Sequence, residues 1–218
     1  MRLTRVITLA LLTLVAALEP VSAGALAVTL KDSKGAPVSD AVVYAIPAGS
    51  TPTGDRSQAV IDQQNKEFIP YVTAVQVGTS ILFPNKDNIR HHVYSLSPAK
   101  RFELPLYTGI PAAPIIFDKV GFVTLGCNIH DWMIAYVAVL PTPYFRVTGS
   151  SGRVTLKDLP ASGYQVEVWH PLLKGTPERL AQQLDLTGKE IQNLTFNLDL
   201  KPDLRTRRAP ELSHGGYP

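Results

Sequence analysis

The chain has 218 residues, of which 45% are hydrophobic and 18% charged, and its formal net charge is +3 at pH 7 with histidine counted as neutral. Lysine and arginine are scattered along the chain and form no stripe, so nothing in the charge pattern indicates a nucleic-acid partner. With a single cysteine the chain cannot form an internal disulfide bond, and its length is enough for one or two domains with a buried core.

The N-terminal residues have the pattern of a secretory signal peptide. Arg2 and Arg5 precede an apolar run over residues 6–18, and the small residues Val21-Ser22-Ala23 follow it. A membrane anchor is the alternative, but a bilayer span needs about 20 apolar residues and this run is shorter. We therefore expect cleavage after Ala23, export to the periplasm and no stable membrane insertion of the mature chain.

Short runs of β-branched and aromatic residues dominate the rest of the chain. They are bounded by Gly, Pro, Asn and Asp, and helical periodicity is almost absent. This pattern predicts an all-β protein of the sandwich or barrel kind. In chain order, the expected strands cover residues 26–30, 41–46, 72–77, 80–83, 91–96, 114–117, 121–125, 134–140, 144–147, 153–156, 164–169 and 193–198. The one helix expected is a short turn over residues 178–183.

Two segments near the ends of the chain resemble parts of one known sandwich. The stretch Ala27–Val43 resembles the opening of the carboxypeptidase regulatory-like β-sandwich, and the stretch Gly152–Val166 resembles its close. The resemblance implies one small sandwich made from both ends of the chain, with a middle domain inserted between its strands. The expected segments are a signal peptide (1–23), the N-terminal strands of the regulatory-like sandwich (24–57), the inserted domain (58–140), the C-terminal strands of the sandwich (141–200) and a disordered tail (201–218).

The sole cysteine begins the most informative motif of the sequence. Cys127, His130 and Met133 follow one another at three-residue steps directly after an expected strand. Thiolate, imidazole and thioether together suit a copper site in which two His and one Cys form a plane and a weaker Met ligand is axial. His91 and His92 offer the second imidazole. Neighbouring strand residues point to opposite faces, so one of this pair can face a metal, and spacing does not decide which.

The middle domain resembles the plastocyanin-type and amicyanin-type cupredoxins, most closely those of methylamine-utilisation clusters. The matching features are the run Phe83–Asp87 leading to His91-His92-Val93, and the Cys-x2-His-x2-Met loop that starts at Cys127. The resemblance implies a Greek-key β-sandwich over residues 58–140 that binds one copper ion per chain. The implied ligands are His91, Cys127, His130 and Met133. His92 stands where the family usually has Asn, so it is either a residue behind the cysteine or the alternative ligand.

A copper ion held by four protein ligands has no open position for a substrate, which indicates electron transfer and not an enzyme. In the cupredoxin family the histidine of the cysteine loop, here His130, lies at the surface within an apolar patch and is the electron gateway. Ile129 and Trp132 would flank it, and residues 104–116 would either extend the patch or form an ordinary buried loop. The expected partners are redox proteins of unknown identity.

Other functions fit parts of the same pattern. One is a copper-binding accessory or assembly factor for a periplasmic redox enzyme such as an amine dehydrogenase. A structural zinc site fits one Cys and a Met less well, and an adhesive or carbohydrate-binding sandwich with an inert buried Cys would bind no metal. His170 is expected to be a hydrogen-bonded residue at a strand end, and His214 to lie in the tail without a specific role.

Overall fold

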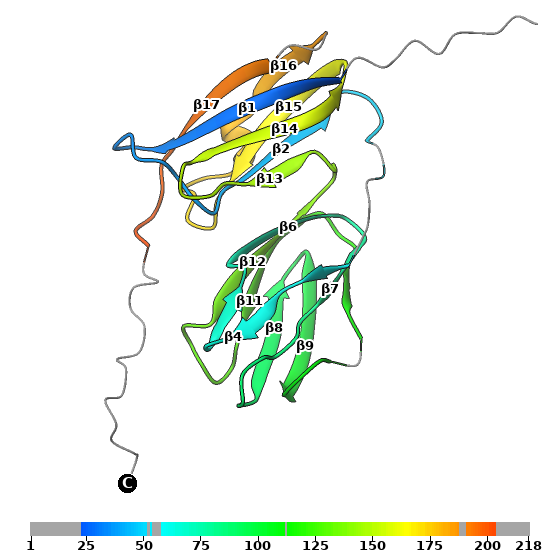
Figure 1. Cartoon of the computed structure of the whole chain (residues 1–218), viewed down its shortest axis with the longest axis vertical. Helices are drawn as coiled ribbons and strands as arrows, with labels where there is room; N and C mark the ends of the chain where they lie inside the picture. The colour runs from blue at the N-terminus through cyan, green and yellow to red at the C-terminus, as the bar shows by residue number, and fades with distance from the viewer. Residues whose placement is uncertain (1–22, 52, 54–57, 112, 188–190, 204–218) are drawn as a thin grey trace, which may run out of the picture.

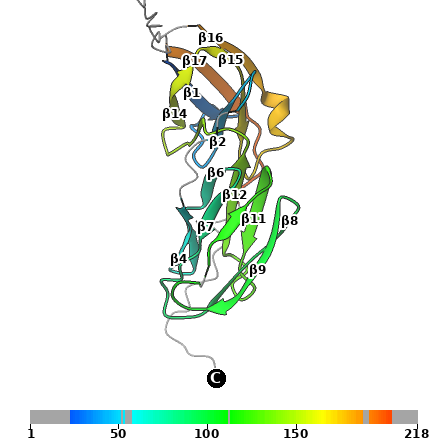
Figure 2. The same cartoon turned by 90° about the vertical axis from the view of Figure 1, so that its right-hand side faces the viewer.

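The structure of the protein is a computed structural model that describes residues 23–51, 53, 58–111, 113–187 and 191–203. The expected signal peptide, apart from Ala23, and the part of the expected tail that contains His214 lie outside these residues. The described strands form two β-sandwiches stacked along the long axis of the molecule (Figures 1 and 2), which confirms the all-β expectation. Within the described residues there is no helix with the length and apolar character needed to cross a membrane.

The terminal sandwich is built from both ends of the chain. It contains β1 (Ala23–Asp32), β2 (Val42–Pro47), β13 (Phe145–Val147), β14 (Arg153–Pro160), β15 (Ser162–Trp169), β16 (Gln182–Leu186) and β17 (Ile191–Leu198). One sheet has the order β14-β1-β17, and the other has the order β13-β2-β15-β16. In β1 the apolar residues Leu26, Val28 and Leu30 are buried and alternate with partly exposed neighbours, so that one face of the strand enters the core.

The middle sandwich lies between β2 and β13 in the chain. It contains β3 (Ala59–Val60), β4 (Asp62–Gln64), β5 (Glu67–Ile69), β6 (Val72–Gln76), β7 (Thr79–Leu82), β8 (His91–Ser97), β9 (Lys100–Tyr107), β10 (Ile115–Phe117), β11 (Gly121–Gly126) and β12 (Ile134–Leu140). A three-stranded sheet, β10-β7-β3, faces a five-stranded sheet, β6-β12-β11-β8-β9, and β4 and β5 form a separate hairpin. Because β8, β11 and β12 are neighbours, the loop after β11 lies close to the start of β8.

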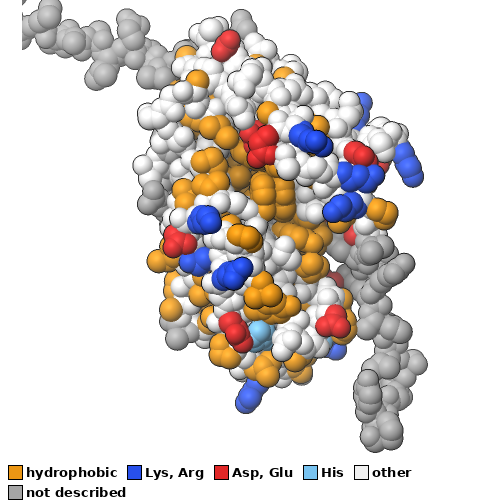
Figure 3. All heavy atoms as spheres, turned by 180° about the vertical axis from the view of Figure 1, so that it is seen from behind, with side chains coloured by type: hydrophobic (Ala, Val, Ile, Leu, Met, Phe, Trp, Pro, Cys, Tyr) orange, Lys and Arg blue, Asp and Glu red, His pale blue; other side chains and the backbone are white. Residues whose placement is uncertain are grey.

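The two sandwiches pack against each other through a cluster of apolar and aromatic side chains. Trp169 of β15 is nearly buried, and its ring stacks on Phe122 of β11 with a centroid distance of 4.5 Å and an interplanar angle of 2°. The cluster also contains buried residues of both sandwiches: Val42, Tyr44, Val72, Ala138 and Leu140. Figure 3 shows hydrophobic side chains gathered over the middle of one face of the molecule. Burial of the cluster that contains Trp169 and Phe122 favours one fixed arrangement of the two sandwiches.

Several elements were not expected from the sequence. The hairpin β4–β5 and the edge strand β9 carry many polar or charged residues and were not recognised as strands. The expected helical turn is a 3₁₀ turn at Pro177–Leu180, and the chain is already extended as β16 from Gln182, within the range expected to be helical. Residues 104–116 also differ from a simple loop, because Leu104–Tyr107 belong to β9.

Candidate metal centre

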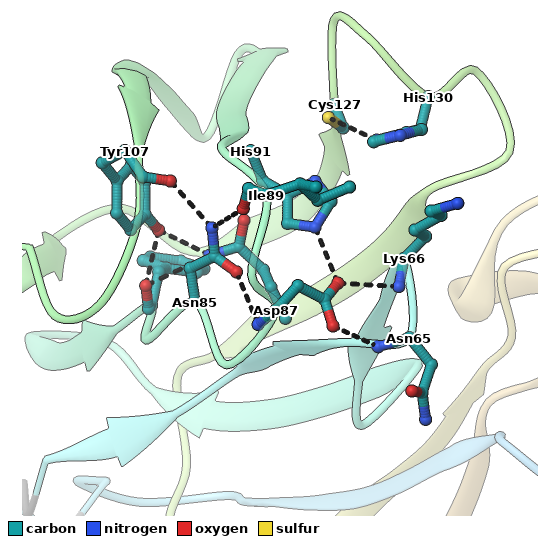
Figure 4. A network of polar contacts seen from close by, with 11 residues as sticks. Asn65, Lys66, Asn85, Asp87, Ile89, His91, Tyr107, Cys127 and His130 are labelled. Carbon is teal, nitrogen blue, oxygen red and sulfur yellow. Dashed lines mark hydrogen bonds and ion pairs between the residues drawn. The ribbon is translucent and has the colours of Figure 1, made fainter.

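Three of the predicted metal ligands lie together at one end of the middle sandwich. The ligand atoms of His91, Cys127 and His130 all lie within 4.8 Å of one another. Cys127 Sγ is 3.8 Å from His130 Nδ1, and the two imidazole rings are 5.0 Å apart between centroids. His91 is the first residue of β8, Cys127 directly follows β11, and His130 lies in the loop between β11 and β12. Figure 4 shows the His91 ring close to the loop that carries Cys127 and His130.

Met133 closes the loop that carries Cys127 and His130. Its backbone N–H donates a hydrogen bond to the carbonyl oxygen of His130 at 2.9 Å, which makes a tight turn before β12 begins. Met133 is 2% exposed and Cys127 is 4% exposed, and both belong to the core cluster of the middle sandwich. The thioether residue and the thiol residue therefore share one buried environment.

The hydrogen bonding of His91 leaves one of its ring nitrogens available for a ligand. The residue is fully buried, and Nε2 lies 2.7 Å from Asp87 Oδ2. Nδ1 is also buried and has no hydrogen-bond partner. A carboxylate acceptor assigns the proton to Nε2, so Nδ1 presents a lone pair. A buried polar atom without a partner is unfavourable, and a metal ion coordinated there would satisfy it. The residues present therefore fit a metal centre with two nitrogen donors and one thiolate.

Asp87 is a positioning residue that the sequence analysis did not identify. Its carboxylate accepts hydrogen bonds from the backbone N–H groups of Asn65 (2.7 Å) and Lys66 (2.9 Å) at the tip of the β4–β5 hairpin, in addition to the contact with His91. Figure 4 shows Asp87 between the hairpin and the imidazole. Partial burial alone would raise the pKa of Asp87, but the hydrogen bonds from Lys66, His91 and Asn65 outweigh it and hold this pKa below its ordinary value. The ionised carboxylate therefore orients His91.

The segment between β7 and β8 is held in place by Asn85. Its side-chain Nδ2 donates to the carbonyl oxygens of Ile89 (2.9 Å) and Tyr107 (2.7 Å), and its Oδ1 accepts a hydrogen bond from the Asp87 N–H at 3.0 Å. Tyr107 lies opposite His91 in the β8–β9 ladder. Burial raises the pKa of Tyr107 to about 12, so its phenol is neutral at physiological pH. The network fixes the backbone that leads to His91.

Substituting Asp87 by Asn is expected to weaken metal binding about 10- to 100-fold, because residues that orient a ligating His typically contribute this much to affinity. Competition with a chelator of known affinity would measure the change. Asp118→Asn is the matched control, since the Asp118 carboxylate is exposed and pairs with Lys100 at the start of β9. Equal affinities for both variants and the wild type would contradict the role of Asp87.

His92 lies outside the three-residue group. Its Nε2 is 2.8 Å from Glu103 Oε1, and its ring contacts Tyr94 at a centroid distance of 5.4 Å. Its Nδ1 is buried without a hydrogen-bond partner, as in His91. The structure thus brings His91 together with Cys127 and His130, and it directs His92 towards β9.

His130 is the more exposed of the two grouped histidines. Partial burial lowers the pKa of His130, electrostatic interactions with His91 and Lys66 lower it further, and the carboxylate of Asp87 acts in the opposite direction. The neutral imidazole, which is the form that binds metals, is therefore favoured. The Trp132 ring lies 5.1 Å from the His130 ring, and Ile129 and Trp132 are 48% and 37% exposed.

The wider surface also presents apolar side chains. Within residues 104–116, Leu106, Ile110 and Ile116 are exposed, so this segment is not an ordinary buried loop. His170, by contrast, is nearly buried, and its Nδ1 accepts a hydrogen bond from the Leu172 N–H at 3.1 Å, as expected for a histidine at a strand end.

No protein-family model and no curated protein matches the sequence. Similar solved structures include the Cu-containing nitrite reductase (NirK) from Thermus scotoductus SA-01, with 24% identity over 38% of this chain and a TM-score of 0.36. The purple cupredoxin from Nitrosopumilus maritimus is 22% identical over 38% of this chain and 99% of its own, with a TM-score of 0.33. An oxidized mutant of amicyanin is 18% identical over 44% of this chain and 99% of its own, with a TM-score of 0.35.

The chain spans 22% of the length of the nitrite reductase that it matches. Each of these similarities covers less than half of this chain and is low in both identity and TM-score. These similarities therefore carry no part of the metal assignment, which rests on the arrangement of His91, Cys127 and His130.

Proposed function

We propose that the protein is a periplasmic mononuclear type 1 copper protein of the cupredoxin kind that carries single electrons and is not an enzyme. The observation that carries this proposal is the unpartnered Nδ1 of His91 beside Cys127 and His130, with all three ligand atoms within 4.8 Å. Copper bound there would supply one-electron redox chemistry. The proposed ligands of the single copper ion are His91, Cys127, His130 and Met133. Export rests on the signal-peptide pattern of residues 1–23, and the link to methylamine utilisation rests on the resemblance of the motif.

The surface beside His130 suits brief contact with a redox partner protein. His130 is partly exposed, and the exposed apolar residues Ile129 and Trp132 lie next to it in the loop. Small apolar contact surfaces are typical of weak encounters between electron-transfer proteins. In this proposal His130 passes the electron, while the buried residues His91, Cys127 and Met133 hold the metal away from solvent.

The first test is a titration of the mature protein, beginning at Gly24, with Cu(II), followed by visible absorption and paramagnetic resonance. We expect an intense thiolate charge-transfer band that saturates at one copper per chain and a narrow copper hyperfine splitting. A colourless protein that binds zinc or no metal would contradict the proposal. Fast electron self-exchange would support the carrier function, whereas transfer of copper to an apo-enzyme without electron exchange would support an accessory factor.

Met133→Leu is expected to preserve the visible band and to raise the reduction potential. Leucine keeps the apolar volume of this buried position but removes the fourth ligand. Cu(II) favours a higher coordination number than Cu(I), so this loss destabilises Cu(II) more than Cu(I) even though a thioether is a soft donor. Potentiometric titration monitored at the charge-transfer band would measure the shift. An unchanged spectrum together with an unchanged potential would show that Met133 is not a ligand.

A further inference from the structure

A groove of about 400 Å³ lies on the outer face of the five-stranded sheet, beside the loop from Cys127 to Met133. It exists because β8 and β11 separate there. Gly126 pairs with Tyr94, and farther along the Ser97 hydroxyl, in place of a backbone carbonyl, accepts a hydrogen bond from the Thr124 N–H at 2.9 Å.

Gly126 lets the Tyr94 ring pack closely against the β11 backbone, since a Cβ at this position would lie 3.0 Å from that ring. Tyr94 of β8 and Thr124 of β11 both line the groove. Thr124 is exposed, so its side chain is directed to solvent and not into the core.

The two sulfur-containing residues of the metal centre line this groove, and the two histidines of the centre do not. Cys127 and Met133 are both part of the lining, together with the exposed Asp131. Thiolate and thioether donors prefer Cu(I) over harder ions. A carboxylate at the same groove raises the local concentration of cations. The lining therefore combines an attraction for cations with a preference for Cu(I).

The opposite approach, past His130, is less favourable for a cation. In Figure 4 the Lys66 side chain extends on the side of the centre where His130 lies. His91 is fully buried and its Nε2 is occupied by Asp87, so it offers no entry of its own. The Lys66 ammonium group repels a cation that arrives from this side. The Asp87 carboxylate near it is already hydrogen-bonded to His91 and to the backbone N–H groups of Asn65 and Lys66.

We propose that copper enters the protein as Cu(I) through this groove and is captured first by Cys127 and Met133, before His91 and His130 complete the site. The inference rests on the proposed copper function. On capture Cu(I) dissociates from the ligand that delivers it and binds the sulfur atoms of Cys127 and Met133, the Cys127 thiol proton leaves to buffer, and no electron is transferred. The groove and the exposed His130 surface then separate metal loading from electron transfer.

The test measures the rate at which the apo-protein takes up Cu(I) supplied as its acetonitrile complex without oxygen. Samples are quenched at intervals with excess Cu(I) chelator, and native mass spectrometry gives the copper-loaded fraction. Thr124→Phe places a ring in the groove, and phenylalanine is well tolerated on strands. We expect loading about tenfold slower, because the ring must move aside before copper can enter, with unchanged final occupancy. Thr155→Phe on β14, also at an exposed strand position, is the control and should load at the wild-type rate.

Two charge variants make the test independent of how the added ring packs. Asp131→Asn should slow loading about two- to threefold through loss of electrostatic attraction, whereas Lys66→Gln should leave the rate unchanged. Wild-type loading rates in both Thr124→Phe and Asp131→Asn, or faster loading in Lys66→Gln, would overturn entry through the groove. A wild-type protein that binds no copper at all would instead overturn the proposed function, and the entry route with it.

Discussion

Cys127→Ser is expected to abolish the intense visible band of the copper-loaded protein. The band requires a thiolate sulfur bound to Cu(II), and a serine hydroxyl is a harder donor that stays protonated near neutral pH. Because Cys127 is the only cysteine in the chain, no other thiol can replace it. Absorption and paramagnetic-resonance spectra of the two proteins at equal copper loading would measure the loss. A variant that kept the band would show that the colour does not arise from this site.

The two neighbouring histidines provide a matched pair for the same measurement. His91→Gln is expected to lose or strongly weaken the band. The substitution removes the His91 ring nitrogen Nδ1, which has no hydrogen-bond partner, and leaves only Cys127 and His130 of the three grouped ligands. His92→Gln is expected to retain it, since His92 contacts Glu103 and Tyr94 instead. The reverse result, with the band lost in His92→Gln and kept in His91→Gln, would assign the ligand to His92.

Trp169→Ala is expected to lower the free energy of unfolding by about 3–5 kcal/mol, the usual cost of removing a large buried aromatic side chain. The indole is 8% exposed and stacks on Phe122 across the contact between the two sandwiches. Loss of the indole removes apolar surface that is buried between the two sandwiches, and it leaves a cavity there. We also expect the unfolding transition to broaden or to split in two, because the sandwiches lose part of their coupling. Urea denaturation of the apo-protein would measure both effects.

Trp132→Ala is the control for this change within the same chain. Trp132 is 37% exposed and contacts the His130 ring, so its removal should change stability by about 0.5 kcal/mol or less. Equal destabilisation by the two substitutions would contradict the view that the stacked Trp169 couples the sandwiches.

Part of the metal centre could be predicted because its residues are close in the sequence. The three-residue steps from Cys127 to Met133 lie within one loop, so the spacing alone brings them together. His91 is different, since its place in the group depends on how β8 lies beside β11 in the sheet. The alternation of strand side chains limited the choice to His91 or His92 but did not decide it. The role of Asp87 was not predicted, because two of its three partners are backbone N–H groups, which carry no side-chain signature.

The fold was predictable where strands are apolar and less so where they are polar or lie at an edge. Runs such as Ile134–Leu140 are strongly β-forming and appear as expected. The edge strand β9 has exposed residues along most of its length, and the hairpin β4–β5 is short and polar. The stacking of Phe122 on Trp169 joins residues of different sandwiches, and no local sequence pattern predicts such a contact.

The pairing of β1 and β2 has a consequence for the order in which the newly made chain can fold. β1 pairs with β14 and β17, and β2 pairs with β13 and β15. All four partners follow residue 140, so neither sheet of the terminal sandwich can form until the whole middle sandwich has been synthesised. The ladders of the middle sandwich join strands within residues 59–140. Once folded, this sandwich acts as a short connector between β2 and β13, which reduces the entropy cost of bringing the early and late strands together.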